Sequence, residues 1–322
     1  MTSLAIHGGA GALPRAEMTP ERAETFHGAL REALGVGQGV LAAGGSSLDA
    51  VEATVAWLED CPLFNAGRGS AFTREGVNEM EASIMDGATR RAGAAFLLRR
   101  VRNPVHLARR VMEHTPHVAL AGEAAERFAV EQGLKLEPVE YFFTRERYEA
   151  MLRLRGTDQT ALSEDVVVKL PATDQEASGT VGAVAVDARG NLAASTSSGG
   201  TTNKFAGRVG QAAIIGAGVY AHNATCAISC TGYGEAFLRL AAAHEVSALI
   251  EHRGFELERA AAIVIDRLRE VDGRGGMVGV DREGRVALSF STEGMYRGWI
   301  GPDGRPHTAI YTEAREWPGA QR

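Results

Sequence analysis

The stretch "EASGTVGAVAVDARGNLAAST", residues 176–196, places one threonine, Thr180, between a glycine and a run of mostly small apolar residues. From Gly182 to Ser195 these residues lie on both sides of an Asp-x-x-Gly turn, a pattern that is typical of a β-hairpin. The first strand of this hairpin therefore opens on Gly179-Thr180, directly after a polar segment. This position needs an explanation beyond the preference of threonine for strands.

The second half of the chain repeats this hairpin pattern. Residues 276–289, "GMVGVDREGRVALS", share its glycine, its V-x-V-D strand end and its turn glycine. Between the two hairpins the apolar spacing predicts helices over about 234–252 and 256–271. Strands in runs and helices in pairs favour antiparallel sheets covered by helices, an α+β fold, over a βαβ nucleotide-binding fold.

The first half of the chain carries clear helix start signals. Thr19-Pro20-Glu21 predicts a helix that runs to Gly44-Gly45, and Ser46 or Ser47 caps a second helix. Alternating residues from Asn78 to Met85 predict a strand before the turn Asp86-Gly87. Residues 102–133 are predicted to be helical.

The composition is that of a globular protein. The 322 residues are 45% hydrophobic and 23% charged, and the net charge of −6 offers no basic face for nucleic acid. The N-terminus lacks the basic region of a signal peptide, and no apolar run reaches the roughly 20 residues of a membrane helix. We expect a cytoplasmic protein with no nucleic-acid or membrane partner. The three cysteines (Cys61, Cys226 and Cys230) are expected to be reduced and buried.

Several kinds of catalytic site are excluded by their missing motifs. No Gly-Lys pair exists for a P-loop, and the glycines of residues 35–39 lie in a predicted helix rather than after a strand. His244-Glu245 lacks the second histidine of a zinc protease, while His114 and His117 are interpreted as surface residues. No Gly-x-Ser-x-Gly elbow is present. We therefore expect no catalytic metal and no required cofactor.

The segment of about 155–179 is long, polar and without periodicity, which is typical of a functional loop or a linker. If the chain is cut after Gly179, Thr180 gains an α-amine with an unperturbed pKa of roughly 7.7 to 8.0. This amine can accept the proton of the threonine hydroxyl, so one residue supplies both nucleophile and base. Glycine before the threonine suits the strained backbone that such a cut requires. The polar stretch is then interpreted as the tail of one subunit and Thr180 as the head of another.

Longer segments support this interpretation by their resemblance to a known family. The segments "IHGGAGAL" (6–13), "LFNAGRGSAFT" (63–73), "GTVGAVAVDARGNLAASTSSGG" (179–200), "NKFAGRVGQAAIIGAGVYA" (203–221) and "SCTGYGEAFLR" (229–239) resemble the plant-type L-asparaginase and isoaspartyl peptidase family of N-terminal nucleophile threonine hydrolases, as does "STEGMYRGW" (291–299). The resemblance implies a four-layer αββα sandwich. It also implies self-cleavage into an α subunit (1–179) and a β subunit (180–322), which form one globular domain, and a homodimer of such heterodimers.

The resemblance assigns roles to individual positions. It implies that Thr180 is the nucleophile, that Thr231 and the N–H of Gly232 form the oxyanion hole, and that Arg208 holds the α-carboxylate of the substrate. The carbonyl of Gly234 is a further candidate for substrate contact. Asn65, Gly8 and Gly9 are implied to line the site of the cut between Gly179 and Thr180.

The loop "LEDCPLFNAGR" (58–68) resembles the sodium-binding loop of the same family. There, backbone carbonyls hold a structural ion. By position they would belong to Leu58, Glu59, Cys61, Phe64, Ala66 and Arg68. A structural sodium ion is therefore expected here.

Two positions depart from the family pattern. Most family members have threonine at the position of Ser198, which is counted here with the catalytic residues, and aspartate at that of Gln211, where it pairs with the α-ammonium of the substrate. Gln211 is neutral, so the ammonium is held more weakly unless another carboxylate or the carbonyl of Gly234 supplies the contact. Both departures resemble the taspases, threonine endopeptidases that cleave after aspartate, while residues 291–299 resemble the asparaginase branch.

The expected function is hydrolysis of isoaspartyl dipeptides and L-asparagine by a self-cleaving threonine amidohydrolase. Two alternatives stay open. One is a taspase-like endopeptidase, and the other is an unprocessed fold relative that is not an enzyme. For both the amidohydrolase and the endopeptidase, the expected binding partner is a small-molecule or peptide substrate.

Overall fold

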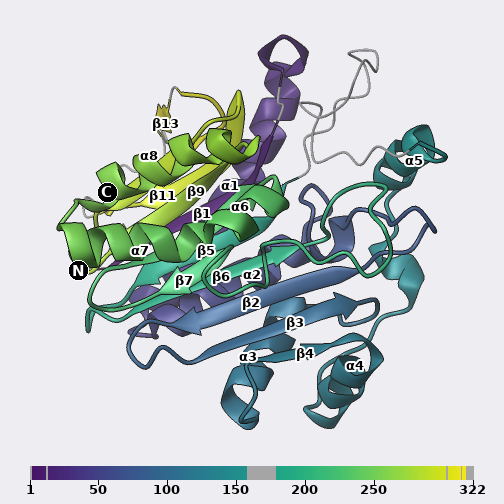
Figure 1. Cartoon of the computed structure of the whole chain (residues 1–322), viewed down its shortest axis with the longest axis horizontal. Coiled ribbons are helices and arrows are strands. Elements are labelled where there is room, and N and C mark those ends of the chain that lie inside the picture. The colour runs from purple at the N-terminus through teal and green to yellow at the C-terminus, as the bar shows by residue number, and fades with distance from the viewer. Residues whose placement is uncertain (1, 12–13, 158–178, 302–303, 313, 317–322) are drawn as a thin grey trace.

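The computed structural model describes residues 2–11, 14–157, 179–301, 304–312 and 314–316. Within these ranges the strands form two sheets, which lie face to face (Figure 1). The larger sheet has the order β13-β12-β11-β1-β5-β6-β2-β3-β4, and the smaller has the order β10-β9-β8-β7. The strands of the larger sheet are β1 (Ser3–Gly11), β2 (Met80–Asp86), β3 (Ala92–Leu98), β4 (Ala119–Ala121), β5 (Val181–Val186), β6 (Leu192–Ser198), β11 (Gly294–Ile300), β12 (Pro306–Ala309) and β13 (Ala314–Glu316). Those of the smaller are β7 (Val219–Ala221), β8 (Cys226–Gly232), β9 (Gly275–Asp281) and β10 (Val286–Phe290).

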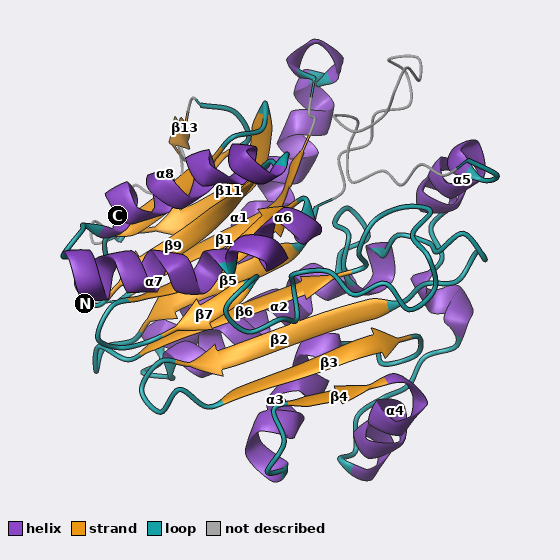
Figure 2. Cartoon of the chain, viewed as in Figure 1, coloured by secondary structure: helices purple, strands orange, loops and turns teal. Residues whose placement is uncertain are grey.

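Most of the helices cover the outer faces of the two sheets, while α5 lies beyond their end (Figure 2). Those that precede β5 are α1 (Pro20–Ala42), α2 (Ser47–Asp60), α3 (Pro104–His114), α4 (Gly122–Glu131) and α5 (Arg145–Leu154). Those that follow β8 are α6 (Gly234–Leu240), α7 (Ala242–Arg253) and α8 (Leu257–Arg267). None of the described helices is both long and apolar enough to cross a membrane.

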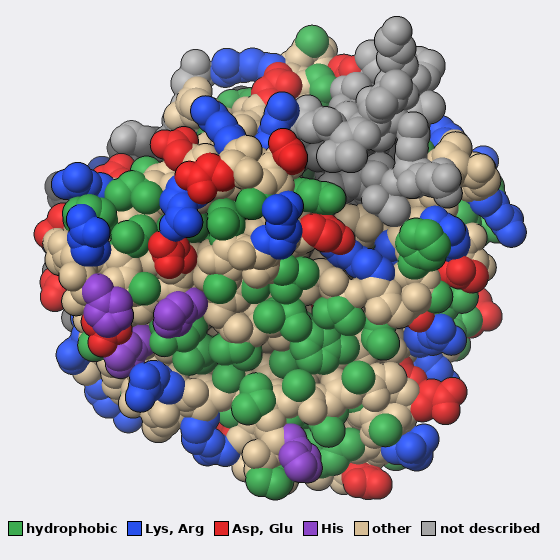
Figure 3. All heavy atoms as spheres, in the orientation of Figure 1, with side chains coloured by type: hydrophobic (Ala, Val, Ile, Leu, Met, Phe, Trp, Pro, Cys, Tyr) green, Lys and Arg blue, Asp and Glu red, His purple; other side chains and the backbone are tan. Residues whose placement is uncertain are grey.

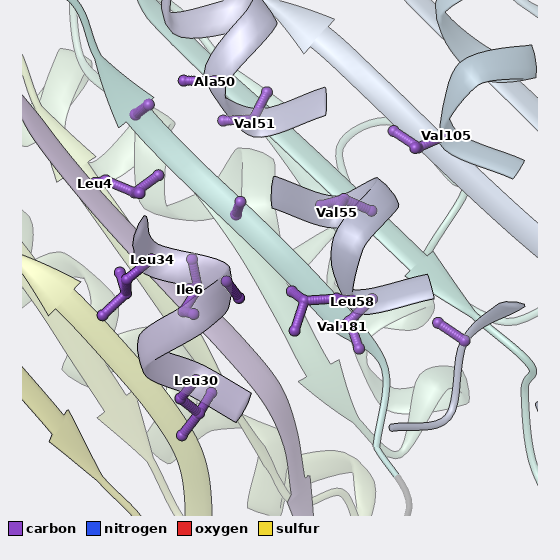
Figure 4. Close-up of a cluster of buried hydrophobic side chains, with 14 of the residues drawn as sticks. Leu4, Ile6, Leu30, Leu34, Ala50, Val51, Val55, Leu58, Val105 and Val181 are labelled. Carbon is purple, nitrogen blue, oxygen red and sulfur yellow. The ribbon is translucent and has the colours of Figure 1, made fainter. Parts of the chain in front are cut away.

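Three clusters of buried side chains define four layers. The first packs α1 and α2 onto the larger sheet, where Leu30, Leu34, Val55 and Leu58 contact strand residues such as Ile6 (Figure 4). The second packs α6, α7 and α8 onto the smaller sheet. The third lies between the sheets and combines residues of β1, β5 and β6 with residues of β7, β8 and β9. The α+β class and the αββα sandwich expected from the sequence are therefore confirmed.

Both predicted hairpins and the first two predicted helices are present. β5 pairs with β6 in the larger sheet, and β9 pairs with β10 in the smaller one. The Thr19 side chain accepts a hydrogen bond from the N–H of Arg22 at the start of α1. Ser46 and Asp49 form a reciprocal capping box at the start of α2. These local signals act within a few residues, so the sequence alone can predict them.

Two predicted helices were wrong in extent. The helix expected over 234–252 is interrupted at Ala241, which adopts a left-handed conformation with φ 47° and ψ 47°. At the start of α7, the N–H groups of Ala243 and His244 donate to the carbonyls of Ala217 and Gly216 instead of continuing the helix before them. The segment 102–133 divides into α3 and α4, with β4 between them, because Pro116 prevents a continuous helix.

The three cysteines are free, as expected, but only Cys226 and Cys230 are fully buried. Cys61 is half-buried at the end of α2. His114 and His117 are exposed, in agreement with their interpretation as surface residues.

Candidate active site

The candidate nucleophile lies at the head of β5, on the face of the larger sheet that meets the smaller sheet. In the ladder of β5 and β6, Val181 is opposite Ser197, so Thr180 falls opposite Ser198. The Thr180 hydroxyl donates a hydrogen bond to Ser198 Oγ over 3.1 Å. Thr180 is only 4% exposed. The threonine hydroxyl is therefore fixed in one direction and shielded from bulk water.

Two further side chains contact Thr180. The Gln211 amide donates to Thr180 Oγ1 over 3.4 Å, so residue 211 faces the hydroxyl group itself. His7 of β1 lies 2.9 Å from the Thr180 carbonyl through Nδ1 and 2.8 Å from Ser229 Oγ through Nε2. Burial lowers the pKa of His7 to about 3, so the imidazole is neutral at ordinary pH. A neutral ring that donates from Nδ1 can position Thr180, but Nε2 is directed away toward Ser229.

Gly9 of β1 and Gly179, the residue before Thr180, bring two backbone segments into direct contact. An added Cβ at Gly9 would lie 2.5 Å from the Cα of Gly179, and one at Gly179 would lie 2.3 Å from the Cα of Gly9. Gly9 also has a φ of 121°, which an L side chain rarely adopts. At Gly8 an added Cβ would clash with the Phe64 ring, at 2.3 Å. The glycine pair on β1 therefore lets the chain before Thr180 pass closely over this strand.

Thr231 and Gly232 end β8 and approach from the smaller sheet. Thr231 Oγ1 accepts a hydrogen bond from the N–H of Ala10 over 3.1 Å, which leaves its own hydroxyl proton available to a ligand. Gly232 has a φ of 140°, and an added Cβ there would lie 2.5 Å from the Arg274 carbonyl oxygen. Only glycine fits this conformation and this space.

Asn65 braces the chain that follows Ser198. Its Nδ2 donates to the Gly200 carbonyl over 2.6 Å, and its Oδ1 accepts from the N–H of Ala71 over 2.8 Å. The N–H of Gly199 donates to the Asn65 carbonyl. Asn65 therefore holds the strand end that carries the hydrogen-bond partner of Thr180.

Arg208 lies among three glycines. Added Cβ atoms at Gly200, Gly210 and Gly234 would lie 3.3, 2.7 and 2.8 Å from its guanidinium nitrogens. Its Nε and Nη2 donate to the Glu235 carboxylate over 3.1 and 3.0 Å. Glu235 thus takes one edge of the guanidinium and leaves Nη1 on the other side, next to Gly200 and Gly210.

Sequence reasoning did not identify three charged residues near Arg208, namely Glu235, Lys204 and Glu81. Lys204 Nζ donates to the carbonyls of Glu79 and Gly199, and burial lowers the pKa of this lysine to about 8. Glu81 is 4% exposed, and its Oε2 accepts from the N–H of Gly210. The signal for Glu81 was present in the alternation of residues 78–85, which placed it on the polar face of a strand. The sequence does not predict which part of the chain packs against that face.

In the loop expected to hold sodium, the carbonyls of Cys61 and Ala66 accept backbone hydrogen bonds, and those of Glu59 and Phe64 lie against glycines. Added Cβ atoms at Gly67 and Gly69 would lie 2.3 Å from the Glu59 oxygen and 2.0 Å from the Phe64 oxygen, so glycines make room for these carbonyls. The Leu58 carbonyl finds no helical N–H four residues on, because that residue is Pro62. Neutral carbonyl oxygens are ligands for hard cations, and the structural sodium ion stays a prediction for this loop.

These features define the class of protein. Two facing sheets, antiparallel except where β4 pairs with β3, lie between helical layers and carry a buried threonine at the head of a central strand, which is the fold of the N-terminal nucleophile hydrolases. The family model for asparaginases matches residues 1–310, and the chain belongs to this family.

Individual relatives are similar over nearly the whole chain. An isoaspartyl peptidase of Salmonella typhimurium is 48% identical over 311 residues, which cover 96% of this chain and 98% of the relative. An isoaspartyl peptidase of Escherichia coli is 47% identical, with 96% of both chains covered. An isoaspartyl peptidase/L-asparaginase of Rattus norvegicus is 40% identical, with 90% of this chain and 83% of the relative covered.

Proposed function

We propose that this protein is a self-cleaving threonine amidohydrolase that acts on isoaspartyl dipeptides and L-asparagine. The observation that carries the proposal is the placement of Thr180. It lies buried at the head of β5, its hydroxyl donates to Ser198, and Thr231 and Gly232 approach from the opposite sheet. The names of the relatives from three organisms support the same activity.

The first step is self-cleavage between Gly179 and Thr180. Thr180 Oγ attacks the Gly179 carbonyl carbon, the C–N bond breaks, and the acyl group moves from nitrogen to oxygen as an ester. Water then hydrolyses this ester, which releases the Gly179 carboxylate and restores the threonine hydroxyl. The hydroxyl proton ends on the leaving nitrogen, which becomes the α-amine of Thr180, and Ser198 is placed to relay it because Thr180 already donates to its hydroxyl. The tight passage of Gly179 over Gly9 holds the scissile bond beside the hydroxyl.

The second step uses the new α-amine of Thr180 as the base. The amine takes the proton of Oγ while the oxygen attacks the side-chain amide carbon of the substrate. The hydroxyl of Thr231 and the N–H of Gly232 stabilise the charge that develops on the carbonyl oxygen. The amine or ammonia leaves with the proton, and water releases aspartate from the acyl-enzyme. His7 stays neutral in this mechanism, since its pKa is about 3.

Arg208 supports a substrate with a free α-carboxylate. The Nη1 group of Arg208, which Glu235 does not occupy, can donate charge-assisted hydrogen bonds to a carboxylate. Gln211 favours the second candidate, a taspase-like endopeptidase, because a neutral residue beside Thr180 also suits a chain whose α-amine is already acylated. The similarity to isoaspartyl peptidases, at 48% and 47% identity, supports the first candidate.

We further propose a homodimer of the processed heterodimers and a structural sodium ion. Figure 3 shows hydrophobic side chains gathered in the middle of one face, over the part of the view in which Figure 1 labels β2 and β7, with charged side chains toward the margin. Such a face is typical of a subunit interface. The sodium ion would be held by carbonyls of the loop 58–68 and would act on loop stability alone.

A hydrolysis panel tests the proposed function. It compares L-asparagine, a β-aspartyl dipeptide, glycosylated asparagine and a peptide with an internal aspartate, using protein that has matured in solution. We expect turnover of the dipeptide and of L-asparagine. Cleavage of the internal aspartyl bond alone would favour the endopeptidase, and an uncut, inactive chain would favour the non-enzymatic alternative.

A further inference from the structure

The acidic residue that faces Arg208 from the larger sheet is part of the same row as Thr180. In the ladder of β2 and β6, Glu81 is opposite Ser198, just as Thr180 falls opposite Ser198 in the ladder of β5 and β6. Residues directly opposite in an antiparallel sheet present their side chains on the same face, about 5 Å apart. Thr180, Ser198 and Glu81 therefore form one line across three strands, all directed toward the smaller sheet.

One oxygen of Glu81 has no hydrogen-bond partner among the described residues. Oε2 accepts from the N–H of Gly210 over 3.0 Å, and the backbone of Ala212 lies close enough to the carboxylate to lower its pKa, whereas Oε1 is buried and has no hydrogen-bond partner of normal geometry. Burial raises the pKa of Glu81, and the nearby charges of Arg208 and Lys204 oppose this effect. A buried carboxylate oxygen without a donor is costly, so its retention needs an explanation.

The unpartnered oxygen and Arg208 both lie next to Gly210. An atom at the Cβ position of Gly210 would lie 2.8 Å from Glu81 Oε1 and 2.7 Å from Arg208 Nη1. Because Glu235 takes the other edge of the guanidinium, Nη1 is the side that is left for a ligand. An anion and a cation that face each other across a glycine match a carbon atom that carries both a carboxylate and an ammonium group.

The residue beside the nucleophile does not supply such an anion. The side chain of Gln211 is neutral, and its amide group already donates to Thr180 Oγ1. The substrates of the proposed function carry an α-ammonium next to the α-carboxylate that Arg208 would bind. Glu81 Oε1 can accept from this ammonium, and the pair gains strength because the surroundings are shielded from water.

We propose that Glu81 is the anionic binding residue for the α-ammonium group of the substrate, a role that Gln211 does not fill. The inference rests on the proposed function, since it names the residue that selects an α-amino acid substrate at that site. It predicts that the protein discriminates strongly between two ligands that differ only in this amine.

L-aspartate and succinate are such a pair, because succinate has both carboxylates but lacks the amine. Binding of each is measured by titration calorimetry on the matured protein and on the Glu81→Gln variant, which keeps the shape of the side chain and the acceptor for Gly210. We expect the variant to bind L-aspartate about 10- to 100-fold more weakly, the range of one charge-assisted hydrogen bond. Succinate affinity should change less than threefold.

Glu79→Gln is the matched control. Glu79 is also 4% exposed and near the start of β2, but it pairs with Arg99 at 2.8 Å. This control should keep the wild-type preference for L-aspartate within threefold, and thermal unfolding of both variants checks their folding. Equal weakening of both ligands in Glu81→Gln, or no change in either, would overturn the proposal. The binding test needs no turnover, so a failure of the hydrolysis panel and a failure of this inference are distinguishable.

Discussion

Glu235 provides the sharpest test of how Arg208 is presented to a substrate. Its carboxylate binds the Nε and Nη2 edge of the guanidinium at 3.1 and 3.0 Å. In our account it holds Arg208 in place and leaves Nη1 to the substrate. Glu235→Gln keeps one acceptor oxygen but removes the charge, so the guanidinium should be less firmly oriented.

The size of the effect follows from the exposure of the pair. The side chain of Glu235 is 43% exposed and that of Arg208 is 14% exposed, so solvent screens the ion pair. Half-exposed ion pairs of this kind contribute about 0.2–1 kcal/mol. At 1.4 kcal/mol per tenfold change, the KM for a β-aspartyl dipeptide should rise by about 1.4- to 5-fold, with kcat nearly unchanged.

The assay is steady-state hydrolysis of a β-aspartyl dipeptide at low and high salt. Glu245→Gln is the matched control, because Glu245 forms a comparable half-exposed pair with Arg267 on α7 and α8, at 2.6 Å. The control should leave KM unchanged, and high salt should shrink the difference between wild type and Glu235→Gln. A lower KM in Glu235→Gln would refute the reasoning, since Glu235 would then compete with the substrate for Arg208.

Three further predictions follow from the geometry. Gly9→Ala should slow the appearance of the fragment that begins at Thr180 on denaturing gels, because its Cβ would lie 2.5 Å from the Cα of Gly179 at a φ of 121°; maturation at the wild-type rate would contradict this. Gly232→Ala should lower kcat by about 100-fold, the loss typical of a displaced oxyanion donor, and an unchanged kcat would remove Gly232 from that role. The pKa of His7 is about 3 when folded against 6.5 when unfolded, so the unfolded chain binds the proton first and stability is lost as pH falls below 6.5. Between pH 7 and pH 5, the free energy of unfolding measured with urea should fall by about 2 kcal/mol more for wild type than for His7→Asn. An equal fall in both proteins would contradict the buried neutral histidine.

The parts of the fold that sequence reasoning predicted depend on local signals. The turn of residues 187–190 and the caps at Thr19 and Ser46 each act within one turn of chain, and the structure contains them as expected. The break at Ala241 was missed because it is tertiary in origin. The start of α7 donates to carbonyls of Gly216 and Ala217, which are more than 20 residues earlier in the chain.

The candidate site was also predicted only in part. Its positions in the glycine-rich motifs were identified by resemblance. The structure brings Ser198 and Gln211 into contact with Thr180, and Thr231 contacts Ala10 beside Gly9. The neighbours of Arg208 were not predicted. Glu81 reaches the site through strand pairing across 117 positions, since it lies opposite Ser198, and no local pattern encodes such a register.

The proposed mechanism requires that Thr180 is the nucleophile and becomes an N-terminal residue by self-cleavage. Intact-mass spectrometry of the purified wild type and of Thr180→Ala tests it most directly, with folding checked by thermal unfolding. We expect two wild-type fragments, residues 1–179 and residues 180–322, and a Thr180→Ala chain that stays whole. A Thr180→Ala chain that is cut at the same bond, or a folded wild type that remains one uncut chain, would contradict it.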